Sequence, residues 1–148
     1  MIPIPDTTLS RRVIGCAIEV HRHLGPGLLE SVYEACLCEE LTAAGLPFAR
    51  QRSMPVRYKG RTLDQSFQID IIVEETLVLE IKSVTQIHPL HEAQLLTYLR
   101  LSGFQLGLLL NFNAARLTDG IRRIVNSIDR VDEIWTVQDE PIWRAARL

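Results

Sequence analysis

The sequence lacks both the long apolar run of a membrane protein and the leader of a secreted one. Nowhere in its 148 residues does an apolar stretch approach the roughly 20 residues that a membrane-spanning helix needs. The opening residues, MIPIPDTT, contain neither the basic nor the apolar region of a secretory signal. We therefore expect a cytoplasmic protein with no membrane partner.

The sequence has few cysteines and no net positive charge. The cysteines Cys16, Cys36 and Cys38 are odd in number and form no C-x-x-C pair, so neither a disulfide framework nor a zinc site is indicated. The formal net charge of −2 and the isoelectric point near 6.1 argue against a strongly basic, nonspecific nucleic-acid binder. A nucleic-acid surface would have to be local.

What is present is the composition of one ordinary globular domain. Hydrophobic residues make up 47% of the chain and charged residues 23%, and the length suffices for a real core. We assign residues 1–126 to the domain and residues 127–148 to a C-terminal extension. The extension is too apolar for a solvated linker and should pack on the domain or on another subunit, which would give a homodimer. Its large apolar residues are Ile134, Trp135, Val137, Ile142 and Trp143.

Apolar periodicity predicts an α/β domain. Residues spaced three and four apart predict two helices, one from Thr7 or Thr8 to Leu24 and one over 28–44. Their inward stripes are Leu9, Val13, Ala17, Val20 and Leu24, then Leu29, Tyr33, Leu37, Leu41 and Ala44. The later elements are predicted as strands at 47–58, 62–73 and 77–84, a helix at 88–102, a strand at 105–111, and a strand or helical turn at 120–125. This order implies an α/β sandwich around a mixed four- or five-stranded sheet.

Charged residues interrupt the apolar strands at Asp70, Glu80 and Lys82. A short polar break at 74–76 predicts a hairpin that places Asp70 opposite Glu80, with Cβ atoms about 5 Å apart. Such close carboxylates repel unless a proton or a divalent cation intervenes. The oxygen ligands suit Mg²⁺ or Mn²⁺, and Lys82 would orient or deprotonate a water or stabilise anionic charge. The alternative is a structural Asp–Lys–Glu ion-pair network.

Three motifs give the sequence a family resemblance. Asp70 followed by Glu80-Ile81-Lys82 resembles the signature of the PD-(D/E)xK, or restriction-endonuclease-like, nuclease superfamily, although Ile69 replaces the usual proline. Gly27-Leu28-Leu29-Glu30-Ser31-Val32-Tyr33 is similar to the motif of the GxxExxY protein family, a branch of that superfamily. Gln94-Leu95-Leu96-Thr97-Tyr98 is similar to the Q-x-x-x-Y motif of several branches. The resemblance covers residues 8–126.

The resemblance implies a restriction-endonuclease-like fold and a Mg²⁺- or Mn²⁺-dependent nuclease that hydrolyses phosphodiester bonds. Asp70, Glu80, the Ile81 carbonyl and Glu30 would then hold the metal. Lys82 would position the attacking water, and Gln94 and Tyr98 would support it. The implied partner is nucleic acid, DNA rather than RNA. The alternative is a non-catalytic binding or assembly protein that retains the nuclease fold.

The arm from Arg50 to Arg61, formed by the strand at 47–58 and the turn after it, is conspicuously basic. It contains Arg50, Arg52, Arg57, Lys59 and Arg61. Strand alternation predicts that Arg50 and Arg52 share one face and that the last three share the other, unless a bulge at Met54-Pro55 reunites the two sets. A reunited set would form a phosphate-contacting arm beside the site. The alternative is a solvated strand face.

Overall fold

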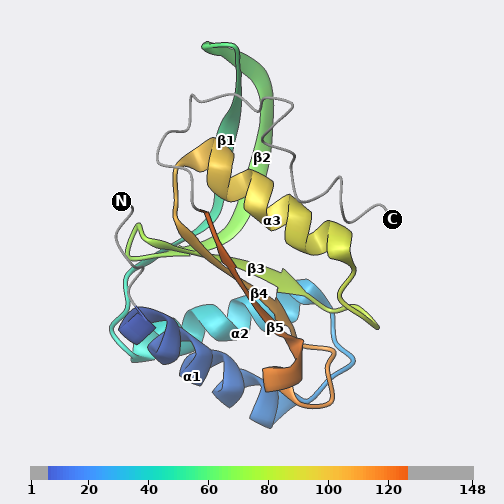
Figure 1. The fold of residues 1–148 in the computed structure, drawn as a ribbon. Coiled ribbons are helices and arrows are strands. Elements are labelled where there is room, and N and C mark those ends of the chain that lie inside the picture. Colours follow the sequence, from blue (N-terminus) through green and yellow to red (C-terminus); the bar gives the residue numbers. More distant parts are fainter. Residues whose placement is uncertain (1–6, 127–148) are drawn as a thin grey trace.

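The computed structural model describes residues 7–126, in which helices flank both faces of one sheet (Figure 1). The predicted α/β class is confirmed, and the sheet has five strands. In chain order the elements are α1 (Thr7–Leu24), α2 (Glu30–Ala43), β1 (Phe48–Tyr58), β2 (Arg61–Val73), β3 (Leu77–Lys82), α3 (Pro89–Ser102), β4 (Leu106–Asn111), the short 3₁₀ helix η1 (Leu117–Gly120) and β5 (Ile121–Val125).

The sheet is mixed, with spatial order β1-β2-β3-β4-β5. β3 and β4 are parallel, and the other neighbouring pairs are antiparallel. The parallel pair needs a crossover connection, which α3 supplies. Both parallel strands are buried on both faces apart from Lys82 at the end of β3, as is typical of a sheet covered by helices on each side.

Two apolar clusters hold the layers together. Below the sheet, α1 and α2 bury their stripes against β3 and β4, and above it α3 buries Leu95 and Leu99 against Ile69, Val78 and Leu109 (Figure 1). The predicted stripes are correct in the helix centres and wrong at two ends. Leu24 is 37% exposed and Leu29 is 73% exposed, because the two residues flank the loop between α1 and α2.

β1 and β2 form a long hairpin that extends beyond the rest of the sheet (Figure 1). Only Ile71, Ile72 and Val73 of β2 pair with β3. A turn at Lys59 and Gly60, with φ of 51° and 76°, closes the far end in the left-handed conformation that two-residue hairpin turns require.

The hairpin corrects the expected distribution of basic residues. A register shift between Pro55 and Arg57 interrupts the regular pairing next to Met54-Pro55, where a bulge could have reunited the two sets. Arg57, Lys59 and Arg61 nevertheless do not share a face. Tyr58 pairs with Arg61, so Arg57 and Arg61 point to opposite sides of the hairpin, and Lys59 lies in the turn. The alternation argument failed because it carried one strand's period through a turn.

Asn111 fixes the loop that follows β3. Its Oδ1 accepts the N–H of Val84, and its Nδ2 donates to the Val84 carbonyl, each at 3.0 Å. Gly120 packs directly behind it, because a Cβ on Gly120 would lie 2.5 Å from the Asn111 carbonyl oxygen and 2.9 Å from the Ala114 Cβ. Asn111 at the end of β4, backed by Gly120, therefore fixes the backbone at Val84, just after Lys82 at the end of β3.

Within residues 7–126, no helix is long and apolar enough to cross a membrane. The proline-containing lead-in and the apolar C-terminal extension at 127–148 lie outside the described residues.

Replacing Gly120 with alanine should destabilise the fold, because the added methyl group meets backbone rather than a flexible side chain. We expect Gly120→Ala to lower the free energy of unfolding by about 1 to 3 kcal/mol. The matched control is Gly15→Ala in α1, where nothing lies within 4 Å of the new Cβ and helix propensity favours alanine by about 0.5 to 1 kcal/mol. Urea unfolding measures both, and equal stabilities for the two variants would contradict the close approach.

Candidate functional site

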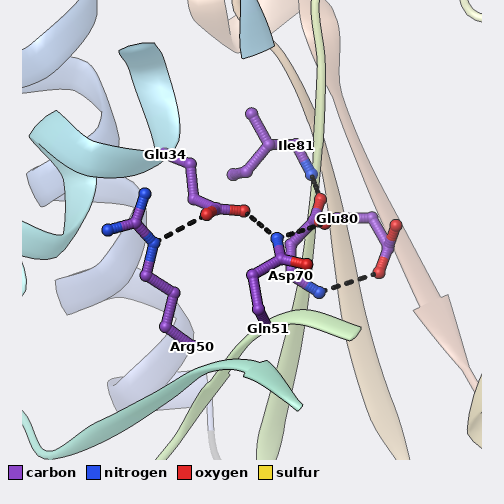
Figure 2. Close-up of polar contacts among 6 residues, drawn as sticks. All are labelled: Glu34, Arg50, Gln51, Asp70, Glu80 and Ile81. Carbon is purple, nitrogen blue, oxygen red and sulfur yellow. Dashed lines mark hydrogen bonds and ion pairs between the residues drawn. The ribbon is translucent and has the colours of Figure 1, made fainter. Parts of the chain in front are cut away.

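The site lies where β2 separates from β3, at Asp70. The β2–β3 ladder ends with the pair Ile71 and Leu79, and side chains take over the next hydrogen bonds. The N–H of Asp70 donates to Oε1 of Glu80 at 3.4 Å, and the N–H of Ile81 donates to Oδ2 of Asp70 at 2.8 Å (Figure 2). The structure thus brings Asp70 and Glu80 together, as the hairpin register predicts.

Burial makes both carboxyl groups costly to ionise. Glu80 is only 6% exposed, and desolvation, followed by repulsion from Asp70, raises the pKa of Glu80 to about 8. The pKa of Asp70 is also raised, above all by desolvation, although the hydrogen bond from the Ile81 N–H opposes this shift. The close pair of a half-buried and a buried acid therefore favours the binding of a proton or a cation.

Lys82 lies on the same face of β3 as Glu80, two residues further along. Its positive charge lowers the pKa of both carboxyl groups, so it is near them. Yet within the described part of the chain it forms no ion pair with Asp70 or Glu80 within 4 Å. The ion-pair network that we considered as the structural alternative is not formed there, and the ammonium group remains available to a ligand.

Glu30 stands at the first turn of α2, beside the end of β3. Its Oε2 accepts the N–H of Ser83 at 3.4 Å, and its charge contributes to the raised pKa of Glu80. It is exposed, and across residues 7–126 no group of three His, Cys, Asp or Glu side chains is placed to hold a metal. Glu30 therefore borders the carboxylate pair without completing a three-ligand set.

Tyr33 of the same motif has a structural task. Its hydroxyl donates to the Gly25 carbonyl at 2.5 Å and accepts the Leu28 N–H at 3.1 Å, while its ring stacks on Phe112. The buried tyrosine thereby fixes the loop from which Glu30 enters α2. Tyr33 therefore braces Glu30 indirectly, through this loop.

The two residues of the Q-x-x-x-Y motif have different environments on α3. Tyr98 stacks on Phe67 of β2, and its pKa is raised first by desolvation and then by the charges of Glu80 and Asp70. Gln94 is exposed and makes no hydrogen bond to Lys82 among the contacts of the described chain. Tyr98 is a neighbour of the carboxylates, whereas the structure does not connect Gln94 to Lys82.

Sequence reasoning missed a second group of polar residues on the other side of Asp70. Glu34, one turn after Glu30, is 6% exposed and forms a 2.7 Å ion pair with Arg50. Gln51 donates from Nε2 to Glu34 at 2.6 Å and to Asp70 at 3.2 Å (Figure 2). The available signal was an acid next to Tyr33 on the inward side of the helix, whereas the motif singled out only Glu30.

A comparison with protein families covers this whole arrangement. A family model described as the PD-(D/E)XK nuclease superfamily matches residues 7–124, which include both N-terminal helices, the hairpin, the carboxylate strands and α3. Searches of curated proteins and of solved structures gave no significant match.

The raised pKa of Glu80 predicts a pH-dependent stability for the metal-free protein. Between its ordinary pKa of 4.5 and about 8, Glu80 is ionised in the unfolded chain and protonated in the folded one. The unfolded state then binds fewer protons, so stability falls as pH rises through this window, by on the order of a few kcal/mol. Urea unfolding with a chelator at several pH values should show this fall relative to Glu80→Gln. Parallel profiles for the two proteins would contradict it.

Proposed function

The chain belongs to the PD-(D/E)XK nuclease superfamily, and on this premise we propose that it is a divalent-metal-dependent nuclease that hydrolyses phosphodiester bonds, with DNA as the expected substrate. The observation that carries the proposal is the pairing of the half-buried Asp70 with the buried Glu80, with Lys82 on the same strand face and not ion-paired to either acid among the described residues.

The donor set fits Mg²⁺ or Mn²⁺. The carboxylates of Asp70 and Glu80, together with the Ile81 carbonyl, are hard oxygen ligands, and Mg²⁺ is usually held by one or two carboxylates with waters and substrate phosphate completing its shell. A site without a third protein carboxylate is thus suitable for Mg²⁺. When bound, the ion supplies a lowered pKa for its water and positive charge for the phosphate oxygens.

The side chains around the pair have distinct proposed tasks. Lys82 orients the attacking water or stabilises the charge that develops on the phosphate. Tyr98, held against Phe67, lies near both acids, whose charges raise its pKa. Gln94, on the exposed side of α3, supports the reaction by contacting substrate. Glu30 would help to hold the metal or would orient the backbone at Ser83, whose N–H donates to its carboxylate.

Finer assignments belong to the same proposal. The motif from Gly27 to Tyr33 supports membership of the GxxExxY family within the superfamily, because Tyr33 ties down the loop that places Glu30. A cytoplasmic location and a homodimer formed through the C-terminal extension stay predictions.

The nuclease proposal is tested by incubating the purified protein with single- and double-stranded DNA and RNA, with and without Mg²⁺ or Mn²⁺. We expect metal-dependent cleavage that falls by at least about 100-fold in Lys82→Ala and Asp70→Asn, because each variant removes charge that acts on the transition state. Glu39→Gln, an exposed substitution on α2, is the control and should retain activity.

Calorimetric titration separates the possible reasons for an inactive protein. Divalent-ion binding that is lost in Asp70→Ala, without cleavage of any substrate, would favour the non-catalytic binding or assembly protein. Equal affinity in wild type and Asp70→Ala would remove the metal site itself.

The substrate surface that we propose is the far end of the β1–β2 hairpin. Arg50 and Arg52 nearer the sheet are engaged in ion pairs with Glu34 and Glu75. Arg57 and Arg61 form no ion pair among the described residues and lie on opposite faces of the hairpin. An arm with a cation on each face suits contact with phosphates on either side of it.

Loss of these cations should weaken the salt dependence of binding. In a Lys82→Ala background, we expect Arg57→Ala and Arg61→Ala each to reduce the slope of log affinity against log salt by about one unit per lost phosphate contact. In the double variant the slope should fall by the sum of the two single reductions, and metal affinity should not change. Arg11→Ala, an exposed α1 substitution, is the matched control. Unchanged slopes in all three hairpin variants would identify the arm as a solvated face.

A further inference from the structure

Gln51 lies opposite Asp70 in the β1–β2 ribbon and has an unusual backbone conformation. The flanking pairs are Arg50 with Ile71 and Arg52 with Ile69, so Gln51 and Asp70 face each other at the one interruption between them. Gln51 has φ of 51°, the left-handed region that residues other than glycine, asparagine and aspartate rarely adopt. The chain therefore maintains a strained residue directly across from a proposed metal ligand.

At Gln51 and Asp70 the two strands of the hairpin exchange the faces to which their side chains point. Ile71 packs in the cluster below the sheet with α1 and α2, whereas Ile69 packs in the cluster above it with α3. Residues two apart in a regular strand would share a face. The same reversal places Arg50 and Arg52 on opposite faces. Arg50 forms an ion pair with Glu34 on α2, below the sheet, whereas Arg52 lies opposite Ile69 in the strand register and so faces the side of α3. Asp70 consequently occupies the point at which the hairpin changes faces.

The side chain of Gln51 uses this point to connect α2 to Asp70. Its Nε2 donates to Oε1 of Glu34 at 2.6 Å and to Oδ1 of Asp70 at 3.2 Å (Figure 2). An amide nitrogen has two hydrogens, and both are committed to carboxylates. The opposite amide orientation would set the Gln51 oxygen against two acceptors, so the contacts fix which way the amide faces.

Both oxygens of Asp70 are thus held, Oδ1 by Gln51 and Oδ2 by the N–H of Ile81. A ligating carboxylate that is fixed in this way presents its remaining lone pairs in one direction. Behind Gln51, the ion pair of Glu34 with Arg50 holds the amide's other partner in place.

We propose that Gln51, supported by Glu34 and Arg50, is a positioning residue that orients the Asp70 carboxylate for the divalent cation. The inference rests on the proposed function, because it assigns Gln51 a task at that metal site. A purely structural role explains the conformation poorly. Glycine adopts a positive φ without strain, so a position that needed only the backbone turn would be better filled by glycine than by glutamine.

The test exploits that same property of glycine. Gln51→Gly removes the amide and relieves the backbone, and this relief offsets part of the cost of the lost hydrogen bonds, so the variant should remain folded. We expect its Mn²⁺ dissociation constant, measured by calorimetry, to rise about 10- to 100-fold, the usual effect of losing a group that orients a metal ligand. The matched control is Glu74→Gly, an exposed turn residue with φ of 51°, which gives the same backbone relief and should leave Mn²⁺ affinity unchanged.

Gln51→Asn provides a second variant, because asparagine tolerates the left-handed conformation but is one methylene too short to span both carboxylates. It should show the same loss of Mn²⁺ affinity. Full wild-type affinity in Gln51→Gly or in Gln51→Asn would overturn the positioning role while leaving the nuclease proposal intact. Absence of Mn²⁺ binding by the wild-type protein would instead remove the proposed metal site and this inference with it.

Discussion

The structure depends on how it accommodates two carboxyl groups, the buried Glu80 and the half-buried Asp70, at the point where β2 leaves β3. Glu80 is almost entirely buried, with a pKa raised to about 8, and such a group is tolerated only with hydrogen bonds, a proton or a cation. The backbone meets this requirement by ending the ladder early, so that the N–H groups of Asp70 and Ile81 turn to carboxylates instead of strand carbonyls. The separation of the strands also releases the β1–β2 hairpin from the sheet, and the site and the arm therefore have one structural origin.

Most of the fold followed from the sequence, because its signals are local. Gly103, with φ of 85°, ends α3 as expected, and the uninterrupted apolar runs of β3 and β4 are the buried parallel pair. The errors occurred where an apolar pattern was continued beyond the part of the helix that packs on the sheet. Leu24 and Leu29 continue the helical stripes by spacing but are exposed. Periodicity identifies the inward face of a helix, whereas the covered length depends on the layer beneath it.

In the candidate site, too, the residues set by local sequence could be predicted and those set by tertiary contacts could not. Asp70 and Glu80 could be paired in advance, because a short hairpin loop fixes the register of its strands. Gln51 could not be found, since glutamine has no preference for a positive φ and alternation assumes that none occurs. Glu34 depended on Gln51 in turn, because its burial is compensated by Arg50 and Gln51 of a strand that only tertiary structure brings to α2. The reversal at Gln51 also explains why Arg50 and Arg52, expected on one face, meet acids in different places.

The charges that the described residues place around the site do not balance. Two carboxylates of α2 and two of the strands, Glu30, Glu34, Asp70 and Glu80, stand against the two cations Arg50 and Lys82. His91 does not supply the difference, because desolvation, followed by the charge of Lys82, lowers its pKa. A proton on Glu80 removes one of the two excess negative charges at neutral pH. A divalent cation would displace that proton and compensate both, so the raised pKa of Glu80 and the fit to Mg²⁺ are two consequences of the same deficit of positive charge.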